Sequence, residues 1–347
     1  MGRCQIFSAP ARLSAADSER INTETNEKEP VVYEGKSVAV VVPAHNEEKL
    51  LGQVLETMPD FVDLIVVVDD ASTDQTLEIA AAWSKRLGDR LLLVAHKENQ
   101  GVGGAITTGY KHALEQHSDV VAVMAGDAQM DPADLSRVIA PVARVEADYV
   151  KGNRLFRGES WAMIPHYRYL GNAVLSLLTK IASGYWHIAD SQCGYTAISR
   201  IALERLDLDG IYKQYGMPND ILVKLNVGDF RVCDVSVRPV YNVGERSGIR
   251  LRKVIPTISW LLLRNFYWRL TEKYIIRDFH PLIFFYLMGL TLLPAGILLG
   301  SYLLFYRLCI GTVAATSALC AAFLTVSGLQ SLFFAMWFDM DYNKHLK

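Results

Sequence analysis

The sequence predicts an α/β fold in which a mostly parallel sheet carries helices on both faces, followed by interfacial amphipathic helices and a C-terminal pair of transmembrane helices. Three observations support this prediction. Short β-branched runs alternate with helical patterns between about residues 37 and 150. Aromatic and basic residues share one helical pattern at 253–275, and two long uncharged segments fill most of 281–338.

Four apolar runs define the predicted sheet: SVAVVVPA, DLIVVVDD, RLLLVAH and DVVAVMAGD. Strands without polar alternation are typical of a parallel sheet that is covered on both faces. In such sheets the ligand-binding crevice lies at the carboxyl ends of the strands. Polar clusters follow three of these runs and are expected to converge there: His45, Asn46 and Glu47, then Asp69 and Asp70, then Asp127, Gln129 and Asp131.

The third cluster has the composition of a metal site. In an extended chain residues i, i+2 and i+4 share a face, so Asp127, Gln129 and Asp131 are expected to face the crevice together. Carboxylate and amide oxygens suit a hard divalent cation such as Mg²⁺ or Mn²⁺, which would neutralise a leaving diphosphate. Taken alone, the segment is also compatible with a turn and a helix N-cap.

Two other patterns narrow the choice of function. In NQGVGGAITTGY, Gly101 and Gly103 are followed by Ile106, so the third glycine of a dinucleotide fingerprint is missing and a tight turn into a helix is favoured. A net charge of −2 gives no indication of a nucleic-acid partner, and none is expected. Five scattered cysteines without a CxxC motif favour a reducing compartment over a disulfide framework or a zinc site.

Membrane insertion is predicted for the C-terminal region. Residues 281–306 and 308–338 carry no charge, and about 20 apolar residues suffice for a helix to cross the hydrocarbon core. A short turn around 307–312 would join two spans, although a buried hairpin of a soluble domain is the alternative. Lys and Arg flank the outer ends of both spans, which places the domain and both termini in the cytoplasm: Arg264, Arg269, Lys273, Arg277, Lys344 and Lys347.

The segments at the two ends of the soluble part have different characters. Residues 1–36 are polar and aperiodic and contain no apolar core of a signal peptide, so disorder is expected. Residues 168–186 and 253–275 are helical patterns with broad apolar faces, the latter rich in Trp and Arg. Interfacial helices beside the membrane spans are predicted, and core helices with a charged outer face are the alternative.

The segments VVVPAHNE, VVVDDASTDQT, NQGVGGAITTGY and GDAQMDPADL, in this order, resemble the inverting GT-A glycosyltransferases of family 2. The resemblance is closer to the branch of dolichol-phosphate mannose synthases and polyprenyl-phosphate glycosyltransferases, and it covers about residues 38–250. It implies a Rossmann-like GT-A fold. The expected organisation is a disordered segment 1–36, a GT-A domain 37–250, juxtamembrane helices 251–279, two transmembrane helices within 280–340 and a cytoplasmic tail 341–347.

The resemblance also implies roles for the polar clusters. Its nucleotide-binding positions fall on Pro43, His45 and Glu47, and its base- and ribose-binding pair falls on Asp69 and Asp70. A carboxylate beside a base is chemically sensible, because uracil and guanine both present N–H donors. The metal motif, usually written DxDxQ, falls on Ala125, Asp127 and Gln129. With alanine at the first position, Asp127 and Gln129 are the expected ligands and Asp131 is a further candidate, so metal and sugar nucleotide should bind together.

Downstream motifs point to phosphate binding. The resemblance places Arg154 and Arg168 where relatives have arginines that face phosphates, and a guanidinium fork suits phosphate oxygens. Residues 189–198 resemble the segment that lines the sugar-acceptor region. Asp220 falls near a catalytic acidic position, with a helix N-cap as the alternative. A basic loop would clamp a diphosphate or a lipid headgroup and contains Arg246, Ser247, Arg250, Arg252 and Lys253.

The expected function is transfer of a hexose, with inversion, from a GDP- or UDP-linked sugar to a polyprenyl phosphate at the cytoplasmic membrane face, assisted by Mg²⁺ or Mn²⁺. Such an acceptor is already an anion, whereas a hydroxyl acceptor would need a base such as Asp220. One alternative is extension of a glycolipid or polysaccharide, although the QxxRW motif of processive synthases is missing. Another is a degenerate, non-catalytic membrane scaffold, which Ala125 favours. The sequence does not specify which sugar is transferred or the oligomeric state, and it is compatible with a homo-oligomer.

Overall fold

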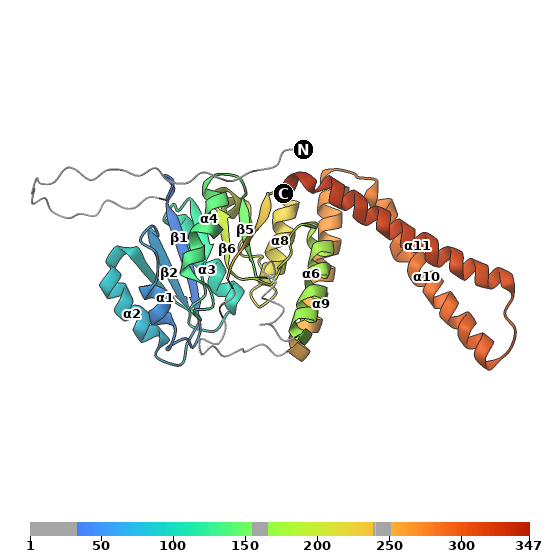
Figure 1. The fold of residues 1–347 in the computed structure, drawn as a ribbon, viewed down its shortest axis with the longest axis horizontal. Coiled ribbons are helices and arrows are strands. Elements are labelled where there is room, and N and C mark those ends of the chain that lie inside the picture. Colours follow the sequence, from blue (N-terminus) through green and yellow to red (C-terminus); the bar gives the residue numbers. More distant parts are fainter. Residues whose placement is uncertain (1–32, 155–165, 239, 241–250) are drawn as a thin grey trace, which may run out of the picture. The chain divides into compact units, whose positions relative to one another are not determined.

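The computed structural model describes residues 33–154, 166–238, 240 and 251–347 (Figure 1). Its sheet has seven strands in the order β3-β2-β1-β4-β6-β5-β7. The strands are β1 Val38–Ala44, β2 Leu64–Asp69, β3 Leu91–Ala95, β4 Val120–Val123, β5 Tyr149–Asn153, β6 Thr196–Ser199 and β7 Val232–Ser236. Most of the segment predicted to be disordered, residues 1–32, lies outside the described residues. Its last four residues, Tyr33–Lys36, form a turn that is closed by a hydrogen bond from Lys36 N to Tyr33 O.

The prediction of a mostly parallel sheet is confirmed. β1 runs parallel to both β2 and β4, β2 runs parallel to β3, and β5 runs parallel to β7. Among the strands of the described residues, β6 alone is reversed, because it pairs antiparallel with β4 and with β5. The carboxyl ends of β1, β2 and β4 therefore meet at one edge of the sheet, which is where ligands bind in open α/β sheets.

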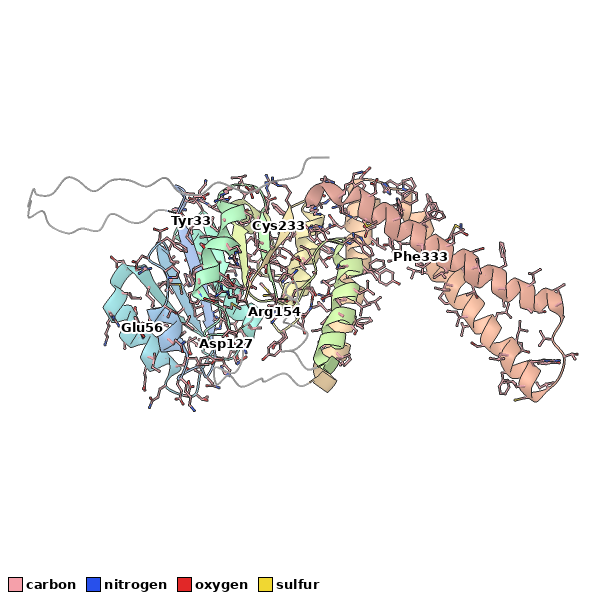
Figure 2. All side chains as sticks on the ribbon, viewed as in Figure 1. Tyr33, Glu56, Asp127, Arg154, Cys233 and Phe333 are labelled. Carbon is pink, nitrogen blue, oxygen red and sulfur yellow. The ribbon has the colours of Figure 1, made fainter. Side chains whose placement is uncertain are left out.

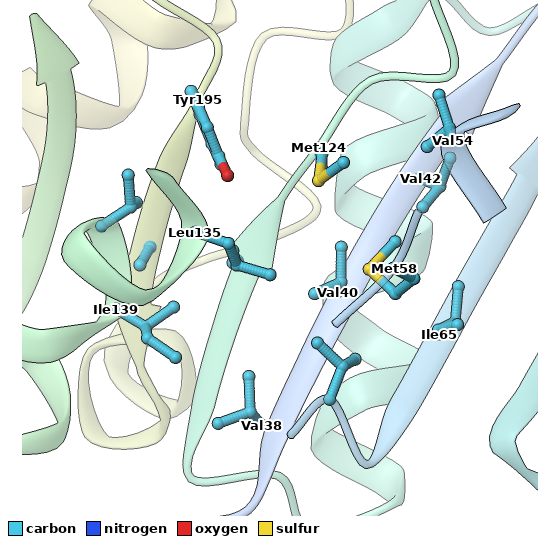
Figure 3. Close-up of a cluster of buried hydrophobic side chains, with 14 of the residues drawn as sticks. Val38, Val40, Val42, Val54, Met58, Ile65, Met124, Leu135, Ile139 and Tyr195 are labelled. Atoms are coloured by element: carbon cyan, nitrogen blue, oxygen red, sulfur yellow. The ribbon is translucent and has the colours of Figure 1, made fainter. Parts of the chain in front are cut away.

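Helices cover both faces of the sheet, as predicted. Alternate residues of β1 point to opposite sides, so Val38, Val40 and Val42 pack with helices α1, α2 and α4 (Figure 3), whereas Ala39 and Val41 pack with α3, α7 and α8. Both faces of the central strand β1 are therefore buried. The helices are α1 Leu51–Glu56, α2 Thr76–Leu87, α3 Val102–Glu115, α4 Leu135–Ala143, α7 Arg200–Arg205 and α8 Met217–Val227. Short 3₁₀ turns are η1 Gly88–Arg90, η2 Pro132–Asp134 and η4 Lys344–Leu346.

Close packing of α3 on β1 depends on a glycine. A Cβ at Gly109 would overlap both methyl groups of Val41 in the centre of the sheet. We expect Gly109→Ala to lower the free energy of unfolding by about 1–3 kcal/mol, because the core has no room for an added methyl. Chemical unfolding in detergent measures this change. Gly171→Ala is the matched control, because Gly171 is an exposed helical glycine with open space around it, and the added methyl should stabilise by about 0.5–1 kcal/mol.

Two long helices, α6 His166–Ser183 and α9 Leu251–Thr271, pack side by side next to the sheet domain (Figure 1). Their inner faces form a third core with α8 and with the C-terminal helices. Their outer faces expose large apolar side chains, as interfacial helices would: Val174, Leu177, Leu178, Ile255, Trp260, Leu263, Tyr267 and Trp268. A π-helix, η3 Glu272–Arg277, follows α9 directly.

The C-terminal helices α10 Leu282–Cys309 and α11 Ala315–Tyr342 form a hairpin. Each is long and apolar enough to cross a membrane, and only 22% of the most apolar stretch of each helix is buried. The connecting turn comprises residues 310–314 and not the predicted 307–312, because α10 continues as a helix through Arg307. Leu346 of the predicted tail is buried in the domain core, so α11 returns to the domain from which α10 departs.

Candidate functional site

The predicted site residues gather at the carboxyl edge of the sheet. Figure 2 shows Asp127 and Arg154 toward this edge, with Tyr33 at the opposite one. Pro43 is buried near the end of β1, and His45 and Glu47 follow it in the loop before α1. Asp69 ends β2 and Asp70 follows it. The expected convergence of three polar clusters is therefore what the parallel topology produces.

Asp70 stabilises the loop that leads into α3. Its Oδ1 accepts hydrogen bonds from Gln100 N at 2.8 Å and from the His96 ring at 2.7 Å, and its Oδ2 accepts one from Gly101 N at 2.8 Å. Gly101 has φ of 87°, a left-handed value that glycine adopts without strain. NQGVGGAITTGY is therefore a tight turn into a helix, as predicted, and the Asp70 carboxylate organises it.

The carboxylate of Asp69 accepts fewer hydrogen bonds than that of Asp70. The Asp69 side chain is almost completely buried, and its Oδ2 accepts a hydrogen bond from Ser72 N at 3.2 Å. Its Oδ1 is buried and has no hydrogen-bond donor within the described part of the chain. A buried carboxylate oxygen without a donor costs free energy, which a bound ligand with an N–H or O–H group can recover. Of the two predicted nucleotide-binding carboxylates, Asp69 is thus the one with an acceptor to offer.

His45 and Asn99 lie together at the exposed side of this loop pair. His45 Nδ1 is 2.8 Å from the carbonyl oxygen of Asp70, and the Asn99 amide is 3.3 Å from the ring nitrogens. Asn46, with φ of 58°, accepts a hydrogen bond from Thr73 N at 2.8 Å and so joins the first two loops. The sequence interpretation missed Asn99, for which the only local signal was its position before the turn.

The segment predicted to bind a metal does not have the predicted extended geometry. The chain turns at 126–128, and Ala128 has φ of 55°, so Asp127, Gln129 and Asp131 do not lie on one face of an extended strand. Asp127 Oδ1 accepts a hydrogen bond from Gln129 N at 3.1 Å. Asp131 Oδ1 accepts one from Ala133 N at 2.9 Å and so caps the helical turn that begins at Pro132. The N-cap alternative therefore describes Asp131 well.

Glu47 and Asp127, which belong to two of the converging polar clusters, lie close enough for their charges to interact. Burial, followed by the negative charges of Asp127 and Asp74, raises the pKa of Glu47 to about 7. Two neighbouring carboxylates that lose solvent favour a cation between or beside them. Among the described residues no group of three or more His, Cys, Asp and Glu side chains could hold a metal ion. A cation bound at Asp127 would therefore need oxygens from Gln129 or from a substrate.

Arg154 is held by a buried carboxylate. It follows β5, and its Nε lies 2.9 Å from Oδ2 of Asp190, whose side chain is 1% exposed. Burial alone would raise the pKa of Asp190, but the charge and hydrogen bonds of Arg154 hold it below its usual value. Lys151, on the same strand, is fully buried and donates to the Cys193 carbonyl oxygen at 2.8 Å; burial lowers its pKa. The segment 189–198 is thus held against the end of β5 by the contacts of Asp190 with Arg154 and of Cys193 with Lys151.

Asp234 on β7 completes this charged group and predicts a pH effect. Its Oδ2 accepts hydrogen bonds from Ala189 N and Asn153 Nδ2, whereas Oδ1 is buried without a donor in the described residues. Burial raises the pKa of Asp234 from 3.8 to about 6. Its ionisation therefore opposes folding, so its stabilising contribution is complete below about pH 4 and is lost as the pH rises through about 6.

The Asp234→Asn variant tests this effect, because the amide cannot ionise. We expect the stability of the wild type relative to this variant to fall by up to about 3 kcal/mol between pH 4 and pH 7. Chemical unfolding of both proteins across this pH range measures the difference. A constant difference would show that Asp234 titrates normally in the folded state.

The remaining residues that were predicted to belong to the site have different outcomes. Asp220 lies in the first turn of α8 and is buried; it accepts hydrogen bonds from Tyr212 N, Lys224 Nζ and Asn265 Nδ2. These contacts stabilise the junction of α8, α9 and the preceding loop. Arg168 lies in the first turn of α6, and its side chain is outside the described part, as are the side chains of Arg252 and Lys253 in the first turn of α9. Arg246, Ser247 and Arg250 lie outside the described residues.

Comparison with known proteins identifies relatives of the sheet domain. Residues 39–207 match the glycosyl transferase family 2 model. The chain is 29% identical, over 59% of its length and 86% of the relative, to a UDP-N-acetylglucosamine–dolichyl-phosphate N-acetylglucosaminyltransferase of Methanococcus voltae. It is 30% identical, over 58% of its length and 82% of the relative, to an undecaprenyl-phosphate mannosyltransferase of Micrococcus luteus. Among solved structures, glucosyl-3-phosphoglycerate synthase of Mycobacterium tuberculosis is similar at 20% identity and a TM-score of 0.49, covering 70% of this chain and 84% of that one.

Proposed function

The chain belongs to glycosyl transferase family 2 and is a glycosyltransferase with the expected GT-A fold, and from this premise we propose that it transfers a hexose from a nucleoside diphosphate sugar to a polyprenyl phosphate. The two relatives named above are transferases whose names specify dolichyl phosphate and undecaprenyl phosphate as acceptors. A GDP- or UDP-linked donor and a lipid phosphate acceptor are therefore the proposed substrates.

The donor would bind at the carboxyl edge of the sheet. Asp69 Oδ1 lacks a donor within the described residues, and the N–H groups of a base or the hydroxyls of a ribose are suitable partners. His45, Asn99 and Glu47 border the same loops, and Pro43, the proposed nucleotide-binding residue before them, is buried near the end of β1. Asp127 and Gln129, with Glu47 nearby and Asp131 as a further candidate, have the hard oxygen atoms that Mg²⁺ or Mn²⁺ prefers. The ion, when bound with the donor, supplies positive charge to the leaving diphosphate.

The proposed chemistry needs no general base. An oxygen of the acceptor phosphate forms a bond to the anomeric carbon while the bond from that carbon to the diphosphate oxygen breaks, so the configuration inverts. The acceptor oxygen is already anionic, and so no proton has to be removed. Arg154, held by Asp190, would orient a phosphate with its guanidinium, and the proposed phosphate-binding residues Arg168, Arg246 and Ser247 would add to it.

The observation that carries the lipid acceptor is the exposed apolar face of α6 and α9. Trp260 is 68% exposed and Tyr267 is 50% exposed, on a helix that leads into η3 and then into the hairpin. Aromatic and basic side chains on a helix beside membrane spans are typical of a helix that lies in the membrane interface. A phosphate attached to a lipid is met at that interface. We further propose that the domain and both chain ends lie on the cytoplasmic side, as the flanking Lys and Arg predict.

The test is transfer of labelled sugar from a panel of GDP- and UDP-sugars to polyprenyl phosphate in vesicles, with and without EDTA. The matched control is the same polyprenol without its phosphate. We expect product only with the phosphate and a loss of product with EDTA that Mg²⁺ or Mn²⁺ restores. Equal transfer to polyprenol would favour a hydroxyl acceptor. No transfer from any donor to either lipid would favour the non-catalytic scaffold.

Replacement of Asp220 does not separate these acceptors cleanly. Its two carboxylate oxygens are occupied by donors from the Tyr212 backbone, Lys224 and Asn265. A loss of activity in an Asp220 variant would therefore also follow from displacement of α8 against α9. The polyprenol control avoids this difficulty, because it changes the acceptor and not the protein.

A further inference from the structure

A fully buried arginine of α9, Arg269, connects helix α11 of the hairpin to helix α6. Every N–H of the Arg269 guanidinium has an acceptor: Nε–H donates to Ala182 O, one terminal nitrogen to Asp339 Oδ1 and the Tyr274 hydroxyl, and the other to Asp339 Oδ2 and Ile181 O. Arg269 and Asp339 are both 0% exposed. Because an unpaired charge is costly in such a place, the two side chains hold α9 and α11 together.

A second buried cation lies one turn further along the chain. Lys273 Nζ donates to Asn226 O at 2.7 Å and to Asn343 Oδ1 at 3.0 Å, and it is 2.7 Å from Asp229 Oδ1. The π-helical geometry of Glu272–Arg277 brings Lys273 and the next residue, Tyr274, to the same buried side. The Tyr274 hydroxyl in turn donates to Asp339. We name this group, Arg269, Lys273, Tyr274, Asp339 and Asn343, the hairpin lock.

The lock contacts helices whose other ends bear the proposed acceptor-binding residues. Arg269 contacts the carbonyls of the last turns of α6, whereas Arg168 lies in the first turn of that helix. α9 ends at the lock and begins at Leu251, immediately after the proposed basic loop. α6 is about 27 Å long at 1.5 Å per residue, and a helix packed along its length moves as a unit. Fixing one end of α6 against α11 therefore fixes the position of the other end relative to the hairpin.

We propose that the hairpin lock is a positioning device that holds the first turns of α6 and α9 at a set position relative to the bilayer, so that the site can use an acceptor embedded in the membrane. The inference rests on the proposed function. The five residues of the lock act through α6 and α9, and none of them is assigned a contact with substrate. Opening the lock should therefore impair transfer to a membrane-embedded lipid much more than transfer to an acceptor that diffuses in water.

The experiment compares two acceptors in full-length protein reconstituted in phosphatidylethanolamine–phosphatidylglycerol vesicles. One is long-chain polyprenyl phosphate in the bilayer, and the other is a short, water-soluble prenyl phosphate. Asp339→Asn removes the charge but keeps the shape, and Asn343→Ala removes hydrogen bonds without leaving an unpaired charge. In both variants the ratio of long-chain to short-chain kcat/KM should fall at least about tenfold, because small displacements of reacting groups have large effects on rate. This ratio does not depend on how much of the enzyme is folded.

Asp341→Asn is the matched control. Asp341 lies on the same helix, but its side chain is 61% exposed and pairs with Lys344 at the surface. This variant should leave the ratio unchanged. An unchanged ratio in both Asp339→Asn and Asn343→Ala, or an equal fall in Asp341→Asn, would overturn the positioning role.

A second measurement separates this proposal from the proposed function. Trp260 fluorescence, obtained as the difference between each protein and its Trp260→Phe counterpart, is measured in vesicles that contain brominated lipid. Quenching should decrease in Asp339→Asn and Asn343→Ala and stay constant in Asp341→Asn. If the wild type transfers sugar to neither acceptor but the lock variants lose quenching, the proposed acceptor is wrong and the lock is retained. Unchanged quenching in both lock variants would contradict the lock.

Discussion

Asp127→Asn is expected to lower kcat/KM for sugar transfer by about a thousandfold while the protein stays folded. Loss of a single preorganised electrostatic partner of a developing charge typically costs about 10²–10³ in rate, and loss of a metal ligand adds to this. Asparagine keeps an oxygen that can accept the hydrogen bond from Gln129 N, so the turn at 126–128 is preserved. Initial rates with polyprenyl phosphate measure the effect, and thermal unfolding checks the fold.

The control for Asp127 is the neighbouring Asp131→Asn. Asp131 caps the turn at Pro132, and asparagine is an equally good N-cap, so we expect a loss of less than about tenfold. Comparable losses of kcat/KM in the two variants would indicate that Asp131 contributes to metal binding as much as Asp127 does. Full activity of Asp127→Asn would contradict the assignment of the metal to this segment. Binding of Mn²⁺ to the wild type should also be much tighter when nucleoside diphosphate is present, since the described side chains supply few ligands.

Arg269→Met is expected to lower the free energy of unfolding by about 3–5 kcal/mol, because it leaves the Asp339 carboxylate buried without its partner. The carbonyl oxygens of Ile181 and Ala182 also lose their donors. Chemical unfolding in detergent micelles measures the change.

Two companion variants define the cause of this loss. Arg144→Met removes an arginine from an ion pair with Glu34 in which both side chains are more than a third exposed, and it should leave the free energy of unfolding almost unchanged. The double variant Arg269→Met/Asp339→Leu removes both buried charges and should recover most of the loss. If the double variant is as unstable as the sum of the single variants, the charge pair is not the source of the effect.

Much of the fold was accessible from the sequence because the signals are local. Near-continuous apolar runs such as 64–69 identify strands that are buried on both faces, and polar residues directly after them identify the carboxyl edge. The two apolar helices were equally clear, since length and hydropathy decide whether a helix can cross a membrane. The position of β6, reversed between β4 and β5, was not visible, because strand direction depends on pairing partners distant in the sequence.

The site was only partly accessible, because individual oxygens matter there. The sequence interpretation treated Asp69 and Asp70 alike, yet the Asp70 carboxylate is occupied by the loop before α3, whereas Asp69 has a buried oxygen without a donor in the described chain. Extended alternation was the wrong assumption for 127–131, because a left-handed residue at Ala128 turns the chain. The closeness of Glu47 and Asp127 arises because β1 and β4 are neighbours in the sheet.

The sequence by itself determined the strand-helix alternation, the polar carboxyl edge and the two long apolar C-terminal helices, since each depends on residue type and spacing within a short segment. Only the tertiary structure decided which carboxylates stabilise the fold and which have an oxygen to offer a ligand. It alone also showed that Arg269 pairs with Asp339, 70 residues away, and with the end of α6. The physical reason is that hydrogen bonds and burial depend on what packing brings within about 3 Å of each polar atom.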